Sequence, residues 1–530
     1  MLDRLKIKIW LPVVILIIIS VFFRFYNLNT TPPGLYPDEA MNGNNALESI
    51  ATGDYKIFYP ENNGREGLFI NIQAFLLKTF GVNEPWVLRS ASAVFGVLTA
   101  LGVYFLVLEI LRNKSEIQAT SYKLQATILA FVSSFFIAIS FWHINFSRIG
   151  FRAIMASAFL AWSLYFVIKA LKLLTTKYQL LLSALAGLVY GAGMHSYIAY
   201  RATPLLIIFV YLIYWWVNKT QISFKKIFIN FVVFVVFALI AFAPLGAYFL
   251  ENPQDFMGRT SQVSVFASDS PILNLAKNTL GTLAMFNFRG DGNWRHNYSG
   301  SPQLFWLVGI FFVLGIIIGI ISLFRNSRLK NDYNTSESET NALPFTLYSL
   351  PYLFAISLFW LLVAFLPVVI SNEGIPHALR AILMIPPVYI ISALGFYFVY
   401  NFSLKHVSKK IIYPVIGLLF VGMIIQSYLF YFIAWGKNPN LQYAFSTRYT
   451  EIGRQIRDIS PAIKKYVVVN TGGVDVRGIP MPSQTVMFIT DTFTPEKQKE
   501  KNVYYILSEQ EKDITDPNAV IFYLEDKISL

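Results

Sequence analysis

Two adjacent carboxylates, Asp38 and Glu39, stand near the start of the chain. They follow an uncharged apolar stretch, residues 9–23, that has basic residues before it. Such flanking predicts a membrane helix that leaves the acidic pair just beyond the bilayer surface. Two carboxylates there could perform acid/base chemistry or bind a metal ion. A solvated acidic loop is the alternative, and it is the more frequent explanation of a lone Asp-Glu pair, so the rest of the sequence must decide.

Arginines recur at positions that the topology below places on the same side as the carboxylates. Arg148 and Arg152 are four residues apart, which on a helix would put both guanidinium groups on one face. Arg201 and Arg380 stand at two further helix ends, and His377 precedes Arg380. Because guanidinium forks match phosphate oxygens, this set predicts a site for a lipid phosphate or pyrophosphate. The alternative is snorkelling of these side chains to lipid headgroups.

A third polar group lies in residues 290–297, where donors, acceptors and an aromatic ring are close together. A tryptophan beside polar side chains suits a sugar, whose C–H face is apolar and whose hydroxyls need partners. A hydrogen-bonded turn that caps the next helix is the alternative. We expect the substrate-binding residues to be Asp291, Trp294, Arg295 and His296, with Arg65, Glu66 and Tyr197 from other outer segments.

The composition is that of a polytopic membrane protein. Of the 530 residues, 55% are hydrophobic and 14% charged, more apolar surface than a soluble protein of this length could cover. The net charge of +13 does not indicate nucleic-acid binding, because the cations are dispersed among the loops. The chain has no cysteine, which excludes disulfides and cysteine metal sites.

Uncharged stretches long enough to cross a bilayer recur along the chain. We expect about eleven transmembrane helices, near residues 9–26, 86–108, 124–142, 153–168, 178–200, 202–218, 227–250, 303–324, 344–370, 381–400 and 411–435. Residues 68–80 are apolar but short and interrupted by polar side chains, which favours an interfacial or re-entrant helix.

The loops between these spans alternate in charge. One set carries three cations per loop, within residues 112–123, 169–177, 219–226, 325–330 and 405–410. The opposite short loops have few. The positive-inside rule therefore predicts a cytoplasmic N-terminus and an extracytoplasmic C-terminus, in the plasma (inner) membrane of a cell.

Three regions should lie outside the membrane on the far side. We expect a transmembrane domain over residues 1–435 with outer loops 27–85 and 251–302, and a small extracytoplasmic α/β domain over residues 436–530. In the tail, strand-like runs at 466–469, 486–489, 503–507 and 520–523 alternate with helical signals. Thr494-Pro495-Glu496 predicts the start of one of these helices.

Several of these segments resemble the GT-C glycosyltransferases, above all the protein O-mannosyltransferase and aminoarabinose transferase relatives of the family 39 type. The resemblance covers about residues 9–435 and is strongest in the first hundred. It is carried by the Asp38-Glu39 pair, Asn63-Gly64-Arg65-Glu66-Gly67-Leu68-Phe69, Leu88-Arg89-Ser90-Ala91-Ser92-Ala93, Phe146-Ser147-Arg148 with Arg152, and Gly374-Ile375-Pro376-His377 with Arg380.

The resemblance implies a GT-C fold and a polyprenyl-phosphate sugar as donor, used at the outer face. It implies that Asp38 is the catalytic carboxylate and that outer arginines hold the donor phosphate. Glu39 would position Asp38, bind a metal or bind the acceptor. No cofactor is certain; relatives associate the acidic loop with a divalent metal, for which Asp38, Glu39 and His377 are the candidate ligands here.

The sequence therefore predicts an integral-membrane glycosyltransferase that moves a sugar, with inversion, from a lipid phosphate to an acceptor hydroxyl on a glycan, lipid or protein. The alternative is a polytopic transporter or lipid flippase. Transporters place ionisable residues near the bilayer midplane, whereas these spans are nearly free of acids. A membrane-anchored receptor would not require the acidic pair or the arginines.

Overall fold

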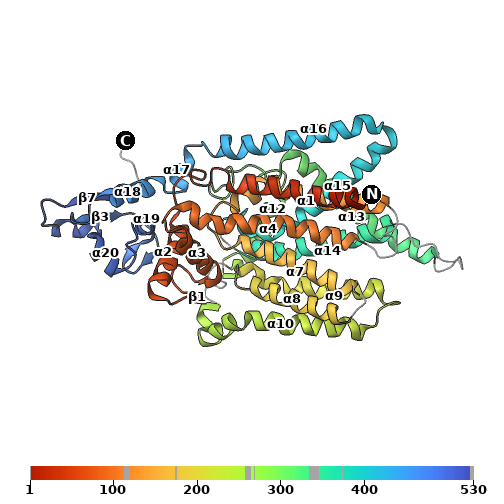
Figure 1. Cartoon of the computed structure of the whole chain (residues 1–530), viewed down its shortest axis with the longest axis horizontal. Coiled ribbons are helices and arrows are strands. Elements are labelled where there is room, and N and C mark those ends of the chain that lie inside the picture. Colours follow the sequence, from red (N-terminus) through yellow and green to blue (C-terminus); the bar gives the residue numbers. More distant parts are fainter. Residues whose placement is uncertain are drawn as a thin grey trace.

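The computed structural model describes residues 2–112, 120–173, 176–256, 264–267, 269–333, 345–371 and 374–525. Long helices run side by side along the long axis of the molecule, and the C-terminal region forms one end (Figure 1). The bundle consists of α1 (Leu2–Phe25), α4 (Pro85–Leu111), α5 (Thr120–Ile139), α7 (Ile154–Lys172), α8 (Thr176–Gly193), α9 (Pro204–Asn218), α10 (Phe224–Glu251), α13 (Trp306–Tyr333), α14 (Phe345–Val369), α15 (Ile385–His406) and α16 (Lys409–Tyr428).

Each predicted span coincides with one of these helices. Within the described residues, eight helical segments are long and apolar enough to cross a membrane by length and composition. The other predicted spans fall on α1, α5 and α8, which are helices with shorter or less apolar stretches. Helix is the form expected for such runs, because it satisfies every backbone polar group within the segment. The lysine-bearing ends of α7, α10 and α15 lie at the end of the bundle opposite the C-terminal region (Figure 1).

The first predicted outer loop contains ordered elements: α2 (Pro37–Thr52), a small hairpin of β1 (Phe58–Tyr59) and β2 (Arg65–Glu66), and α3 (Gly67–Phe80). The short helix expected at residues 68–80 is confirmed as α3; its place at the membrane interface stays a prediction. Within the predicted outer loop 27–85, the acidic pair lies in the first turn of α2. Proline at the first helical position and acidic residues in the first turn favour a helix start there.

The second predicted outer loop is described in part, since residues 257–263 and 268 lie outside the described residues. It contains α12 (Pro271–Ala284) and then an irregular segment, residues 285–305. A short helix, α6 (Phe141–Phe146), precedes the turn into α7.

The C-terminal region is an α/β unit. Its parallel sheet has the order β6 (Val503–Leu507), β3 (Lys465–Asn470), β7 (Val520–Glu525). Around it lie α17 (Asn440–Ala444), α18 (Thr447–Asp458), α19 (Gln484–Thr490), α20 (Pro495–Lys501) and a hairpin of β4 (Asp475–Val476) and β5 (Ile479–Pro480). The start of α20 is confirmed, with Thr494 as its N-cap. The strand predicted at residues 486–489 is wrong: the run belongs to α19, because a short apolar run cannot be told from a buried helix by periodicity alone.

The C-terminal region is packed tightly on α2. Phe488 and Ile489 of α19 are buried in one cluster with Leu35 and Ala40. A Cβ at Gly43 of α2 would lie 2.5 Å from the Phe488 ring, so only glycine permits this approach. Because this core crosses residue 435, the division of the chain there stays a prediction.

Candidate functional site

A polar cavity of about 220 Å³ lies where the segments predicted to be outer meet. Its walls come from segments far apart in the sequence, and many of them carry predicted site residues. The lining comprises Tyr36, Asp38, Asn42, Asn62, Asn63, Arg65, Phe151, Arg152, Ala153, Tyr197, Arg295, His296, His377, Leu379 and Arg380.

Asp38 is the carboxylate that faces this cavity. It lies in the first turn of α2, where the helix dipole favours a negative charge. The side-chain amide of Asn62, at the tip of the β1–β2 hairpin, donates to Asp38 Oδ1 at 2.9 Å. Asp38 is partly exposed, so a substrate can reach it from the cavity.

Glu39 faces away from the cavity, contrary to expectation. It is fully buried, and Arg89 on α4 donates to both its oxygens, from Nε at 2.9 Å and from the terminal nitrogen at 3.0 Å. The backbone N–H of Gly150 donates to Oε2 at 2.7 Å. These contacts occupy the carboxylate, so Glu39 holds three segments together, and the structure does not bring it to the cavity as a catalytic group or metal ligand.

Arginines make the cavity strongly cationic. Arg65 is buried and donates to Asn42 Oδ1 at 2.7 Å, and burial, with the nearby charge of Arg152, lowers its pKa to about 10. Arg152 donates to Glu66 Oε2 at 2.6 Å. Glu66 therefore does not line the cavity itself, but it pairs with Arg152, which does.

Arg295 and Arg380 complete the cationic wall. The Arg295 guanidinium lies 3.7 Å from the centre of the Tyr36 ring, and burial lowers its pKa to about 10. Arg380 begins the short helical turn before α15 and lines the cavity with His377. Guanidinium groups bind carboxylate and phosphate oxygens, so this cavity suits an anionic ligand.

Two of the predicted phosphate-binding arginines, Arg148 and Arg201, do not line the cavity. The prediction that Arg148 and Arg152 share a helix face is wrong, because residues 147–153 form a turn between α6 and α7. Arg148 is buried and donates to the carbonyls of Phe23 and Thr31. Arg201 donates to the Phe256 carbonyl and lies over that ring at 4.2 Å.

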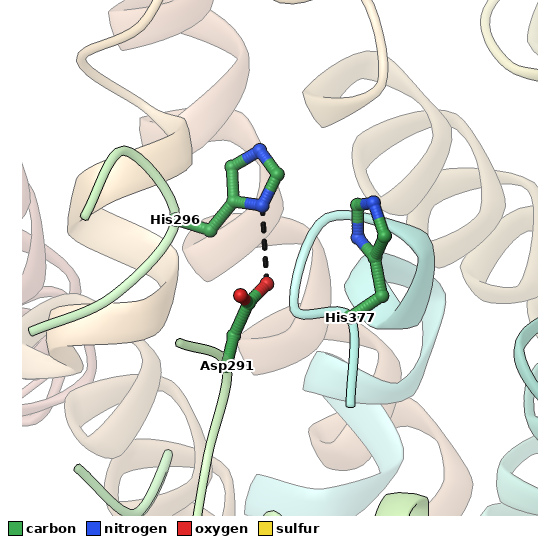
Figure 2. Close-up of side chains that lie close together, drawn as sticks. All are labelled: Asp291, His296 and His377. Carbon is green, nitrogen blue, oxygen red and sulfur yellow. Dashed lines mark hydrogen bonds and ion pairs between the residues drawn. The ribbon is translucent and has the colours of Figure 1, made fainter. Parts of the chain in front are cut away.

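Asp291 joins the irregular segment after α12 to the loop before Arg380. Its Oδ2 accepts from His296 Nδ1 at 3.1 Å and from the Ala378 N–H at 2.8 Å. Burial alone would raise the pKa of Asp291, but the hydrogen bond and charge of His296 and backbone N–H groups outweigh it, so the pKa is lowered. Figure 2 shows Asp291 pointing to His296, with the His377 ring beside them.

Asp291, His296 and His377 also form a candidate metal site. One ligand atom from each lies within 4.8 Å of the others. Two imidazoles and a carboxylate are a donor set that divalent transition metals accept, so the residues fit such an ion. Of the metal ligands predicted from the sequence, His377 belongs to this group, Asp38 lines the neighbouring cavity wall, and Glu39 does not line the cavity.

Trp294 does not line the cavity. Its ring packs against Tyr298, with centroids 5.0 Å apart, and its carbonyl accepts from Trp435 Nε1 at 3.0 Å. The residue therefore fixes its loop against the end of the last bundle helix. The alternative noted for residues 290–297, a hydrogen-bonded turn, describes Trp294 better than a sugar platform.

Sequence reasoning missed Asn42 and Asn62. Asn42 is four residues after Asp38 and shares its helix face, but α2 was not predicted, so the spacing was not used. Asn62 precedes Asn63 and Gly64, and all three have positive φ. An Asn-Asn-Gly sequence is typical of a hairpin turn. This pattern could therefore have predicted the turn that places Asn62 beside Asp38.

A larger, apolar cavity of about 620 Å³ lies between α5, α13 and α16. Phe136, Leu314, Met423 and Phe430 are among its lining residues, and residues 301–304 form one wall. The segment 290–304 therefore contributes to both cavities.

No known protein family and no curated protein matches the sequence. Solved structures do. ArnT from Cupriavidus metallidurans, bound to undecaprenyl phosphate, is 12% identical with a TM-score of 0.51, covering 96% of this chain and 89% of that chain. The apo oligosaccharyltransferase from Archaeoglobus fulgidus is 13% identical with a TM-score of 0.50, covering 93% of this chain and 64% of that chain. The chain thus spans less than two thirds of the archaeal protein, and these likenesses confirm the predicted GT-C fold.

Proposed function

We propose that this chain, on the premise of its GT-C fold, is a membrane glycosyltransferase that moves a sugar from a polyprenyl phosphate to an acceptor hydroxyl. The observation that carries the proposal is the polar cavity, whose lining includes the Asp38 carboxylate together with Arg295, His377 and Arg380. A base and several cationic groups in one cavity suit a reaction that deprotonates one substrate and releases an anion from the other. The undecaprenyl phosphate bound to the structurally similar ArnT supports a lipid-phosphate donor.

In the proposed reaction, Asp38 accepts the proton of the acceptor hydroxyl, whose oxygen attacks the anomeric carbon with inversion. The bond from that carbon to the phosphate oxygen breaks, and the lipid phosphate leaves. Arg295 and Arg380 stabilise the charge on the departing phosphate. Arg152 is already paired with Glu66, so we assign these two residues to the sugar or acceptor side.

The apolar cavity is suited to the donor's prenyl tail. It opens between helices of the bundle and is lined by Phe136, Leu314 and Phe430, among others. Since the segment 290–304 lines both cavities, its Arg295 can contact a phosphate while Leu304 contacts the tail of the same molecule.

A divalent metal would be held by Asp291, His296 and His377. When bound, it would supply positive charge next to the leaving phosphate. The chain's own contribution there is orientation, because Asp291 fixes His296 and the Ala378 backbone, and so the loop that carries His377 and Arg380.

We further propose that the cavity opens on the extracytoplasmic side of the inner membrane, with a cytoplasmic N-terminus. The lysine-bearing helix ends at the opposite end of the bundle support this orientation. The acceptor would then be a glycan, lipid or protein of the cell envelope.

The test is transfer by the purified protein from radiolabelled polyprenyl-phosphate sugars, with and without a chelator, in vesicles of known sidedness. We expect sugar transfer or release when donor and acceptor meet at the outer face, and loss of this activity with chelator if the metal is required. Movement of intact donor across the vesicle without sugar release would contradict the enzyme and favour the flippase. Activity confined to the cytoplasmic face would contradict the orientation.

The donor phosphate site predicts a contrast between arginines. Arg380→Lys keeps the charge but loses the planar fork. Each charge-assisted hydrogen bond lost costs roughly 1.5–3 kcal/mol, or about 10- to 150-fold in affinity. We expect the donor dissociation constant to rise in that range for Arg380→Lys.

Arg201→Lys is the matched control, because this arginine lies outside the cavity lining and contacts a backbone carbonyl instead. Its donor affinity should stay near that of the wild type. Equal donor affinities for the wild type, Arg380→Lys and Arg201→Lys would mean that the donor phosphate does not bind at Arg380.

A further inference from the structure

An arginine of the C-terminal region is held in an unusual conformation at a tight turn. Arg477 and Gly478 link the strands β4 and β5, and both have positive φ, 55° and 85°. Such two-residue turns favour asparagine or glycine at the first position, and another side chain there is strained. The Arg477 guanidinium lies 4.2 Å from the centre of the Phe493 ring, which fixes its direction.

Arg477 binds two elements of the first outer loop at once. Its two terminal nitrogens each donate to one oxygen of Glu48 on α2, both at 2.9 Å. Its Nε donates to Glu61 Oε1 at 2.7 Å, at the tip of the β1–β2 hairpin. One side chain therefore ties the hairpin tip to α2.

Two short paths lead from this contact to the cavity. On the first, Glu61 Oε2 accepts from Asn45, whose Oδ1 accepts from Arg65 at 2.5 Å. On the second, the residue after Glu61 is Asn62, which donates to Asp38. The position of Glu61 thus affects both a lining arginine and the hydrogen bond on the proposed base.

We propose that Arg477 is a positioning residue through which the C-terminal region sets the geometry of Asp38. Arg477 holds the hairpin tip against α2, so that Asn62 and Arg65 remain in place around the cavity. The inference rests on the proposed glycosyl transfer and gives the C-terminal region a part in it. A more mobile tip would misplace the base relative to the acceptor, and small misplacements cost large factors in rate.

The same region has a second tether that reaches no cavity residue. Arg454 and Arg457 of α18 both pair with Glu84, just before α4, at 2.7 and 2.9 Å. These ion pairs resemble those of Arg477 in chemistry and exposure. A variant at this contact therefore shows the effect of weaker docking without an effect on the position of Asp38.

The test measures kcat and donor KM for Arg477→Gln, Arg477→Lys and the control Arg454→Gln. Exposed pairs contribute little to stability, so all three should remain folded. We expect kcat of Arg477→Gln to fall about 10-fold with little change in donor KM, Arg477→Lys to recover part of the loss, and Arg454→Gln to match the wild type. Equal losses in Arg477→Gln and Arg454→Gln would reduce the role of Arg477 to docking and overturn the proposal.

A double-mutant cycle with Asn62→Ala tests the path itself. If Arg477 acts in part through Asn62, the loss in the double variant should be smaller than the product of the two single losses, whereas independent structural effects would multiply. Multiplying losses would overturn the proposal. Hydrogen exchange gives a readout that needs no activity: residues 58–66 should exchange faster in Arg477→Gln than in Arg454→Gln, and equal exchange would also overturn it.

These outcomes are distinct from failure of the proposed function. An inactive wild-type protein would contradict the glycosyl transfer. An active wild type with an unaffected Arg477→Gln variant would contradict the positioning role alone.

Discussion

Replacing Asp38 with asparagine should lower the rate of sugar transfer by roughly 10²- to 10⁴-fold, the usual loss when a general base is removed. The amide keeps the size of the carboxylate, and its oxygen can still accept the hydrogen bond from Asn62. What it loses is the capacity to take the acceptor proton. Turnover of the purified variant, with its melting temperature measured beside it, checks this expectation.

Asp54→Asn serves as the control for this change. Asp54 is exposed just after α2 and does not line the cavity, so the same change of charge should leave turnover unaltered. Asp38→Asn activity within a few-fold of wild type would show that another group takes the proton, and Glu66, which pairs with the lining Arg152, would be examined first.

Replacing the adjacent Glu39 with glutamine should act on stability. The exchange leaves Arg89 buried without its carboxylate, and breaking one side of a buried ion pair costs about 3–5 kcal/mol. We expect a markedly lower melting temperature and a lower yield of folded protein, seen by thermal unfolding in detergent.

The control for Glu39→Gln is Glu48→Gln, on the same helix. Glu48 is partly exposed where Glu39 is fully buried, and partly exposed pairs contribute little, so its melting temperature should change only slightly. Equal melting temperatures for both variants would mean that the Arg89 pair does not support the fold.

The helices of the bundle could be predicted because an apolar run of that length has few other ways to satisfy its backbone. The parallel strands at 465–470, 503–507 and 520–525 were also foreseen, since β-branched and aromatic residues fill them. The helix over residues 37–52 was not, because residues 42–45, Asn-Gly-Asn-Asn, are weak helix formers that favour turns. The run 486–489 is too short for its period to decide.

The charge pattern predicts that Asp38, His377 and Arg380 lie on one side of the membrane, and the structure brings these three candidate residues into the lining of one cavity. Topology cannot tell which of two neighbours turns inward: Glu39 and Arg148 are buried in contacts with partners more than 40 residues away in the sequence. Such partners are fixed by tertiary packing, which a single sequence does not reveal.

The close contact between Gly43 and Phe488 has a consequence for how such proteins can diverge. The C-terminal region and the first outer loop share one core, so neither can be exchanged alone between homologues without a clash or a hole at this contact. A chimera would need both segments from the same parent. Variation at this contact is therefore expected to arise as paired changes in α2 and α19.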